Sequence, residues 1–297
     1  MRILKIVGLL LTIVTTQVCS QKSPYFYGWF FNETVASGLI QITTNYLTKL
    51  YADVEEVQKF LRNVSTTADI DNPLLYYTKP VDPNTGDYDK YFHITTFYCG
   101  TADCSNYTKQ VTQYIDQAFT THLVGVYFTP RTYGIRVNLT SVQREIFDLN
   151  EANAVTLSRF NRNAEPCDVQ LVNGIQFCPQ DDTNFHPTNT RAHVTLGCAP
   201  NISAVTTGLD LIEILNLEMN PSQFCAQIQI DEGNLIQMGE KCDIFVVYLK
   251  KKMVADSTFE AYYRSDAILT MSVPCRLQNF VFLLLLIAFH KALLQFN

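Results

Sequence analysis

A tripeptide of histidine, any residue and threonine occurs twice in this chain, each time in a segment that favours a β-strand. The two copies are His93-Ile94-Thr95, in KYFHITTFY, and His193-Val194-Thr195, in RAHVTLGCA. Apolar and β-branched neighbours indicate strands, and side chains along a strand alternate between its two faces. Each histidine therefore shares a face with its threonine, and the fold must contain two strands that each present an imidazole beside a hydroxyl.

Two such strands facing one pocket can supply both partners of acid–base catalysis. One imidazole acts as the general base and the other as the general acid, while the hydroxyls of Thr95 and Thr195 hold an anion between them. The chain has only five histidines, so a matched setting for two of them is unlikely to arise by chance. For His122, in a strand pattern, and His186, in a polar loop, we expect structural or exposed roles.

The N-terminal segment, residues 1–20, has the form of a secretory signal peptide. It combines Arg2 and Lys5 with an apolar run over 6–14 and ends on the small residue Ser20. The apolar run is too short to span a bilayer comfortably. We therefore expect the mature domain to begin at residue 21.

The C-terminal segment has the form of a glycosylphosphatidylinositol (GPI) attachment signal. Small residues at 265–267 are followed by a spacer over 268–278 and an apolar run over 280–289. We expect attachment at Ser265, with Ser272 as the alternative residue, and a short transmembrane tail is the rival to a lipid anchor. The division is then a signal over 1–20, a domain over 21–265 and a C-terminal signal or anchor over 266–297. It predicts a location on the extracellular face of the plasma membrane, or secretion if the anchor is absent.

Sequons and cysteines agree with an oxidising, secretory compartment. Five Asn-x-Ser/Thr sequons are present, at Asn32, Asn63, Asn106, Asn138 and Asn201. Nine cysteines are present, and Cys19 and Cys275 belong to the two end segments. The simplest framework for the rest pairs neighbours along the chain, namely Cys99 with Cys104, Cys167 with Cys178 and Cys225 with Cys242. Cys198 is left over and is expected to be a buried, inert thiol.

Charge and cysteine spacing argue against two other kinds of site. The net charge is −6 and no extended basic stripe appears, so a surface for long nucleic acids is not expected, whereas a small anion needs only one or two local charges. The cysteines form no CxxC pair, so we expect no structural metal, and nothing in the sequence calls for a cofactor.

The hydrophobic patterns predict a mixture of helices and strands. Helices are expected over 35–50, 54–61, 109–119 and 204–217, with Asp53 and Ser203 as N-caps of the second and the last. Strands are expected over 91–98, 122–128, 134–139, 191–197, 224–230, 244–249 and 261–263, with a polar loop over 179–190. Trp29 is expected in the core. We predict an α+β domain of two similar lobes, each a mostly antiparallel sheet flanked by helices, with the motif strands facing each other across a cleft.

Around the two motifs, the sequence resembles a known family. The segments RAHVTLGCAPNISAVTTGLDLIEIL, HITTFYCG, YFTPRTYGIRV and PYFYGWF are similar to the catalytic domain of the two-histidine (2H) phosphoesterases, and within them to the 2′,3′-cyclic nucleotide 3′-phosphodiesterase (CNPase) family. The resemblance runs from about residue 24 to residue 263. It departs after His93, where the motif is one residue shorter before its aromatic-Cys pair.

The resemblance implies an activity and a set of residue roles. The activity is metal-independent hydrolysis of nucleoside 2′,3′-cyclic phosphates to 2′-phosphates, with His93 and His193 as the acid–base pair and Thr95 and Thr195 as phosphate ligands. Arg191 would contact the nucleotide. The remaining roles are a base-stacking aromatic, either Tyr98 or Phe97, and two residues that line the site, Val205 and Pro130.

Within that resemblance we assign the base to His193 and the acid to His93. The partner would be a small nucleotide, either a 2′,3′-cyclic mononucleotide or an RNA 3′ end, and the protein a monomer held to the membrane by its lipid. Two alternatives stay open. One is a related phosphodiesterase acting on 2′,5′-linked or cyclic-ended oligonucleotides, and the other is a surface nucleotide-binding protein without turnover.

Overall fold

The computed structural model describes residues 23–64, 76–77, 92–100, 102–147, 171–179 and 190–263, nearly all within the compact unit Pro24–Tyr263. The segments expected over 1–20 and 266–297, the attachment residue Ser265 and Cys167 lie outside the described residues, as does the loop expected over 179–190 except for its two end residues. Within the described part of the chain, no helix has the length and apolar character needed to cross a bilayer.

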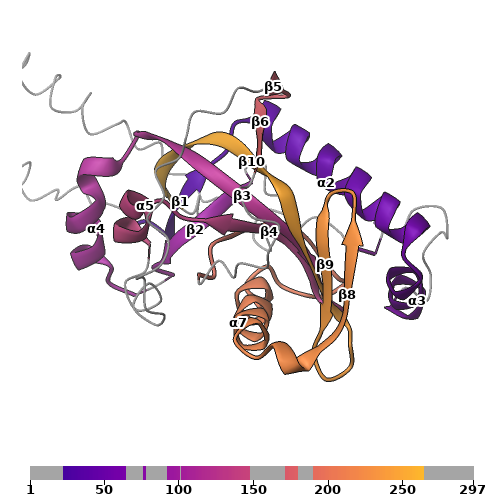
Figure 1. Ribbon diagram of the computed structural model, residues 1–297. Coiled ribbons are helices and arrows are strands. Elements are labelled where there is room, and N and C mark those ends of the chain that lie inside the picture. Colours follow the sequence, from indigo (N-terminus) through magenta and orange to yellow (C-terminus); the bar gives the residue numbers. More distant parts are fainter. Residues whose placement is uncertain are drawn as a thin grey trace, which may run out of the picture. The chain divides into compact units, whose positions relative to one another are not determined.

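The longest strand, β10 (Ile244–Tyr262), runs through the centre of a ten-stranded sheet (Figure 1). Along one edge it pairs with β3 (Ala118–Phe128). Along the other edge it pairs in succession with β9 (Gly233–Met238), β6 (Ile175–Pro179) and β1 (Phe26–Phe30). All of these pairings are antiparallel.

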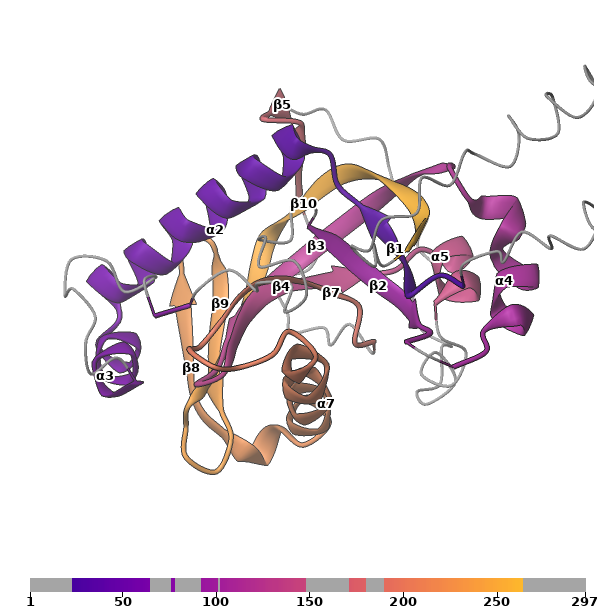
Figure 2. The same ribbon diagram turned by 180° about the vertical axis from the view of Figure 1, so that it is seen from behind.

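The two motif strands form the two ends of the main path through this sheet. The order is β2-β1-β10-β3-β4-β7, where β2 is His93–Tyr98, β4 is Thr132–Asn138 and β7 is His193–Cys198. Four strands separate β2 from β7 in this order, yet their Cα atoms approach within 8 Å, and the two strands lie side by side in Figure 2. The sheet therefore curls until its ends meet, which brings the two histidine motifs together.

This topology confirms the expected α+β class and the antiparallel sheet. The expected division into two lobes, each with a sheet of its own, is not confirmed. The described strands instead belong to one sheet, which is continuous from one motif strand to the other. The continuity comes from β10, which is long enough to pair with strands of both halves of the chain.

Helices cover both faces of the sheet. The helices α2 (Glu33–Asp53) and α3 (Glu55–Val64) pack into the larger apolar cluster, together with Phe128 and Phe245. The helix α7 (Thr206–Glu218) packs into a second cluster that contains Tyr127 and Val246. Because neighbouring residues of a strand point to opposite faces, α7 lies on the face opposite to α2 and α3.

The remaining elements are short. They are α4 (Ser105–Val111), the 3₁₀ turns η2 (Thr112–Tyr114) and η3 (Pro221–Gln223), α5 (Ser141–Ile146), β5 (Leu171–Val172) and β8 (Phe224–Ile230). Trp29, as expected, is fully buried in the larger cluster.

Several boundaries differ from the prediction. The helix expected over 109–119 is wrong, because α4 and η2 end at Tyr114, Asp116 adopts a positive φ of 65°, and the chain enters β3 at Ala118. Both expected N-caps are also wrong. Asp53 is the last residue of α2, and α7 starts after Val205 without a side-chain cap. The strands β1 and β9 and the helix α5 were not predicted.

Candidate active site

The two motif strands show the alternation that their sequences predict. Ile94 and Val194, the middle residues of the motifs, are fully buried. The histidine and threonine on either side of each are half-buried, on the opposite face of the strand. Each strand therefore anchors itself in the core through its middle residue and leaves an imidazole and a hydroxyl at the edge of solvent.

A glycine and a β-bulge accompany each motif, which the sequence analysis did not find. Gly28 of β1 lies opposite Thr95, and the register shift beside it leaves Thr96 without a partner on β1. Gly134 of β4 lies opposite Thr195, and the shift beside it leaves Leu196 without a partner on β4. A bulge bends its strand and redirects the side chains that follow. The similarity between the two motifs therefore extends to their partner strands, since each motif strand pairs with a strand that carries a glycine opposite the motif threonine.

The glycines allow these strands to approach closely. A Cβ atom added at Gly28 would lie 2.7 Å from the carbonyl oxygen of Ile94, and one at Gly134 would lie 2.5 Å from that of Val194. Both distances are too short for any residue other than glycine. The sequence signal is the dipeptide Tyr-Gly inside each strand segment, because an isolated glycine in a strand often marks a bulge or a close backbone approach.

The bulge at Thr96 decides between the two aromatic residues of the first motif. Phe97 pairs with Tyr27 and stacks on Tyr107, with ring centroids 4.2 Å apart, so it packs against the core. Tyr98 pairs with Phe26 on the face that carries His93, and it is 55% exposed. Without the bulge, strict alternation would have put Phe97 on that face. Tyr98 is therefore the aromatic that lies open beside the histidine.

His93 is held by aromatic rings of β1. Its imidazole stacks on Phe26 and Phe30, with ring centroids 4.6 Å and 5.2 Å apart and planes inclined by 24° and 27°. These two stacked rings fix the plane of the His93 imidazole beside the exposed face of the strand.

His193 has contrasting surroundings. Its Nδ1 lies 2.6 Å from the backbone carbonyl oxygen of Arg191, and since a carbonyl can only accept, Nδ1 donates and Nε2 keeps its lone pair. Burial lowers the pKa of His193 to about 4; the positive charges of His93, Arg191 and Arg136 add to this effect, and the bond to the carbonyl opposes it. His193 is consequently neutral at neutral pH, with Nε2 ready to accept a proton.

A buried charge cluster lies behind His193. Arg136, the cross-strand partner of His193, is only 1% exposed and forms two hydrogen bonds to the carboxylate of Glu218 in α7. The hydroxyl of Tyr248 donates to the same carboxylate, and burial raises the pKa of this phenol. The sequence carries no local signal of this cluster, because its three members come from β4, α7 and β10. The cluster places a permanent positive charge beside His193.

The first turn of α7 lies next to the second motif. The Thr195 hydroxyl donates to the hydroxyl of Thr207 over 3.3 Å, and a Cβ at Gly208 would lie 3.9 Å from a guanidinium nitrogen of Arg191. The amides of this turn are already bonded, since those of residues 206–208 donate to the carbonyls of residues 203–205. An anion near Thr195 would therefore be held by side chains, assisted by the dipole of the helix.

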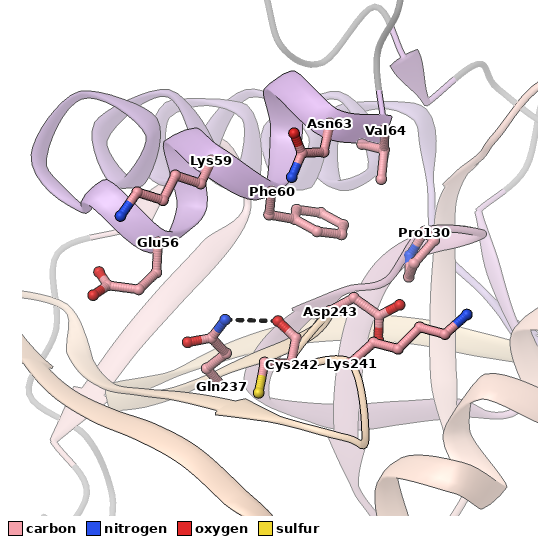
Figure 3. A pocket seen from close by; sticks show the side chains of 10 residues that line it. All are labelled: Glu56, Lys59, Phe60, Asn63, Val64, Pro130, Gln237, Lys241, Cys242 and Asp243. Carbon is pink, nitrogen blue, oxygen red and sulfur yellow. Dashed lines mark hydrogen bonds between the residues drawn. The ribbon is translucent and has the colours of Figure 1, made fainter.

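The two residues expected to line the site have different positions. Val205, immediately before α7, is 71% exposed and adjoins the turn that contacts Arg191. Pro130 lies in the turn between β3 and β4. It is six residues before Arg136, the cross-strand partner of His193, which corresponds to about 20 Å along an extended strand. It lines a different pocket, against α3 and the turn after β9 (Figure 3). The structure thus gathers both motifs, Arg191 and Tyr98, but not Pro130.

The covalent framework agrees with the expected local pairing where it is described. Cys99 is bonded to Cys104 and Cys225 to Cys242, while Cys198 is buried and belongs to neither of these disulfides. Burial raises the pKa of Cys198 to about 11, so its thiol is unreactive at neutral pH. The third expected pair includes Cys167, outside the described residues.

The five sequons differ in their exposure. Four of the asparagines are exposed, namely Asn32, Asn63, Asn106 and Asn201. Asn138 is half-buried, and its side-chain oxygen accepts a hydrogen bond from Arg144 over 3.2 Å. The Asn32 oxygen caps α2 through the amide of Val35, which leaves its side-chain nitrogen on the outside.

Comparison with known proteins yields a family and several relatives. The family described as 2′,3′-cyclic nucleotide 3′-phosphodiesterase (CNP or CNPase) matches residues 23–276. The chain is 27% identical over 248 residues to the 2′,3′-cyclic-nucleotide 3′-phosphodiesterase of Pongo abelii. It is 26% identical over 250 residues to the protein of that name from Mus musculus, and 25% over 248 residues to the one from Rattus norvegicus. Each match covers 81% of this chain and 50% of the relative, so the chain spans about half the length of these curated relatives.

Proposed function

This chain belongs to the 2′,3′-cyclic nucleotide 3′-phosphodiesterase (CNPase) family, and on that premise we propose that it hydrolyses nucleoside 2′,3′-cyclic phosphates to nucleoside 2′-phosphates. The observation that carries the proposal is the meeting of β2 and β7, which brings two imidazoles together in unlike surroundings. The substrate would lie over the two motif strands, in the space that the sequence analysis expected as a cleft. A catalytic pair needs one neutral and one protonated imidazole at the same pH, and the setting of His193 favours the neutral form of that imidazole.

In the proposed mechanism, Nε2 of His193 accepts a proton from a water molecule that attacks phosphorus. The bond between phosphorus and the ribose 3′-oxygen breaks, and the imidazolium of His93 donates its proton to that oxygen. Thr95, Thr195 and Arg191 stabilise the negative charge that grows on the phosphoryl oxygens. The product keeps its phosphate on the 2′-oxygen. Before the next turnover the proton taken by His193 leaves to solvent, and His93 takes up a proton from solvent.

We assign the nucleobase to the side of Tyr98. Its ring is exposed, and its hydroxyl donates to that of Tyr25 over 2.6 Å, which holds the ring in place. Stacking on an aromatic ring tolerates every base, so we expect weak base preference.

The test is an assay of the full chain, purified from eukaryotic cells, on 2′,3′-cyclic AMP with identification of the product. We expect 2′-AMP, and we expect His93→Ala and His193→Ala each to reduce turnover at least ~10²-fold with an unchanged near-UV spectrum. A 3′-phosphate product, or near-wild-type turnover in either variant, would falsify the mechanism. A parallel assay on 2′,5′-linked oligomers separates the alternative phosphodiesterase, and nucleotide affinity without turnover identifies a binding protein.

We further propose that the domain works outside the cell, held by a lipid anchor at Ser265. The sequence pattern of both ends supports this, and so do the two disulfides, because structural disulfides persist in oxidising compartments. Release of the protein from intact cells by a phosphatidylinositol-specific phospholipase is the expected result. Retention after that treatment favours the transmembrane tail, and recovery in the medium without treatment favours secretion.

A further inference from the structure

A pocket of about 330 Å³ lies between α3, the β3–β4 turn and the turn after β9 (Figure 3). Its lining includes the ring of Phe60 and the side chain of Pro130. The polar members, besides Asn63, are Glu56, Lys59, Gln237, Lys241 and Asp243. Pockets that hold small ligands have volumes of roughly 300–1,000 Å³, apolar walls and a few polar groups. This pocket is at the small end of that range and has room for about one sugar ring.

Asn63 supplies the reason to consider a sugar. It begins the sequon Asn63-Val64-Ser65, it is exposed, and it lines this pocket. Figure 3 shows its amide nitrogen directed toward the Phe60 ring. Residues three apart on a helix are neighbours on one face, so the aromatic ring and the glycosylation nitrogen point to the same space.

We propose that the first N-acetylglucosamine of an N-glycan on Asn63 packs in this pocket against Phe60. The inference rests on the secretory location proposed above. One face of the sugar ring presents C–H groups that pack on an aromatic ring, while its hydroxyls and acetamide group bond to polar side chains at the rim. The glycosidic bond to the Asn63 nitrogen starts the sugar at the mouth of the pocket, so no separate binding step is needed and little orientational entropy is lost.

A sugar seated there would join elements that are far apart in the sequence. Phe60 is itself held from behind, with ring centroids 5.1 Å from Phe245 and 5.8 Å from Phe128. The opposite wall contains Cys242, which is bonded to Cys225 of β8. The glycan would therefore bridge α3 to a wall that a disulfide already stabilises. None of the other four sequon asparagines lines this pocket, so the effect should be specific to Asn63.

The test compares Asn63→Gln with Asn106→Gln in the full chain secreted from eukaryotic cells. Both asparagines are exposed residues of helices, so the second variant is a matched control. We expect Asn63→Gln to lower the Tm by at least about 2 °C, and Asn106→Gln to leave it within about 1 °C. We also expect a peptide-N-glycosidase acting on the native protein to release the glycan at Asn63 at least about tenfold more slowly than that at Asn106, because a packed sugar is shielded.

A second variant, Phe60→Leu, separates packing from occupancy. It keeps an apolar side chain and removes the aromatic face, so the glycan should remain attached to Asn63 and become accessible to the glycosidase. Equal release rates at the two sites in the wild-type chain, or an empty Asn63 beside an occupied Asn106, overturn the inference and leave the proposed location intact. If glycopeptide mapping finds all five sequons empty, the proposed location fails together with the inference.

Discussion

The depressed pKa of His193 makes the stability of this protein depend on pH in a calculable way. Folded, His193 binds a proton only below about pH 4, whereas in the unfolded chain it does so below about 6.5. Between these values the unfolded state holds more protons, so stability is full above about pH 6.5 and is lost as the pH falls toward 4. Lowering the pH from about 7.5 to about 4.5 should remove at most about 2.5 kcal/mol from the free energy of unfolding through His193 alone.

The assay is urea unfolding of wild type and His193→Gln at those two pH values, followed by circular dichroism with the disulfides intact. His122, whose pKa burial also lowers to about 4, contributes equally to both proteins and therefore cancels in the comparison. We expect the variant to lose about 2.5 kcal/mol less than wild type on acidification. Identical losses in the two proteins would refute the assignment of a neutral His193 with a lowered pKa. A kcat/KM that already falls below about pH 6.5 would refute its role as the base.

Three further outcomes follow from the geometry of the site. Gly134→Ala should reduce kcat by at least about tenfold and lower the Tm, because its Cβ would meet the Val194 carbonyl at 2.5 Å and push the second motif out of position. Steady-state kinetics and thermal melting check this prediction, and wild-type kinetics would contradict it. Glu218→Gln should lower the free energy of unfolding in urea by about 3–5 kcal/mol, because Arg136 would stay buried without its carboxylate. The control Glu213→Gln, at an exposed ion pair, should lower it by less than about 1 kcal/mol. Equal effects of the two variants would contradict a stabilising role for the buried cluster. Tyr98→Ala should raise the KM for 2′,3′-cyclic AMP at least about fivefold with kcat nearly unchanged, and an unaltered KM would exclude the ring from base stacking.

Local features of the site could be predicted from the sequence, because they depend on neighbours along the chain. Strand periodicity placed each histidine beside its threonine and buried Ile94 and Val194. Short loop closure paired Cys99 with Cys104 and Cys225 with Cys242, and left Cys198 buried. The resemblance in the motif segments agreed with the family that matches residues 23–276.

What the chain cannot encode locally is which strands meet. The ends of the sheet come together because β10 pairs with β1 along one edge and with β3 along the other, and both pairings join residues more than a hundred positions apart. One bulge follows each motif and reverses the alternation of side chains there. In β2 the bulge puts Tyr98, and not Phe97, on the face that carries His93. Strand periodicity alone does not predict such an extra residue.

The difference between the two histidines is also a tertiary fact. The tripeptides are nearly identical, so the sequence by itself determined that a matched pair of imidazoles exists. Folding then placed the rings of β1 against His93, and it placed His193 where burial and the guanidinium of Arg136 lower the pKa of its imidazole. The sequence thus determined that two matched imidazoles exist, and the tertiary structure decided which of them is held neutral and is suited to take a proton.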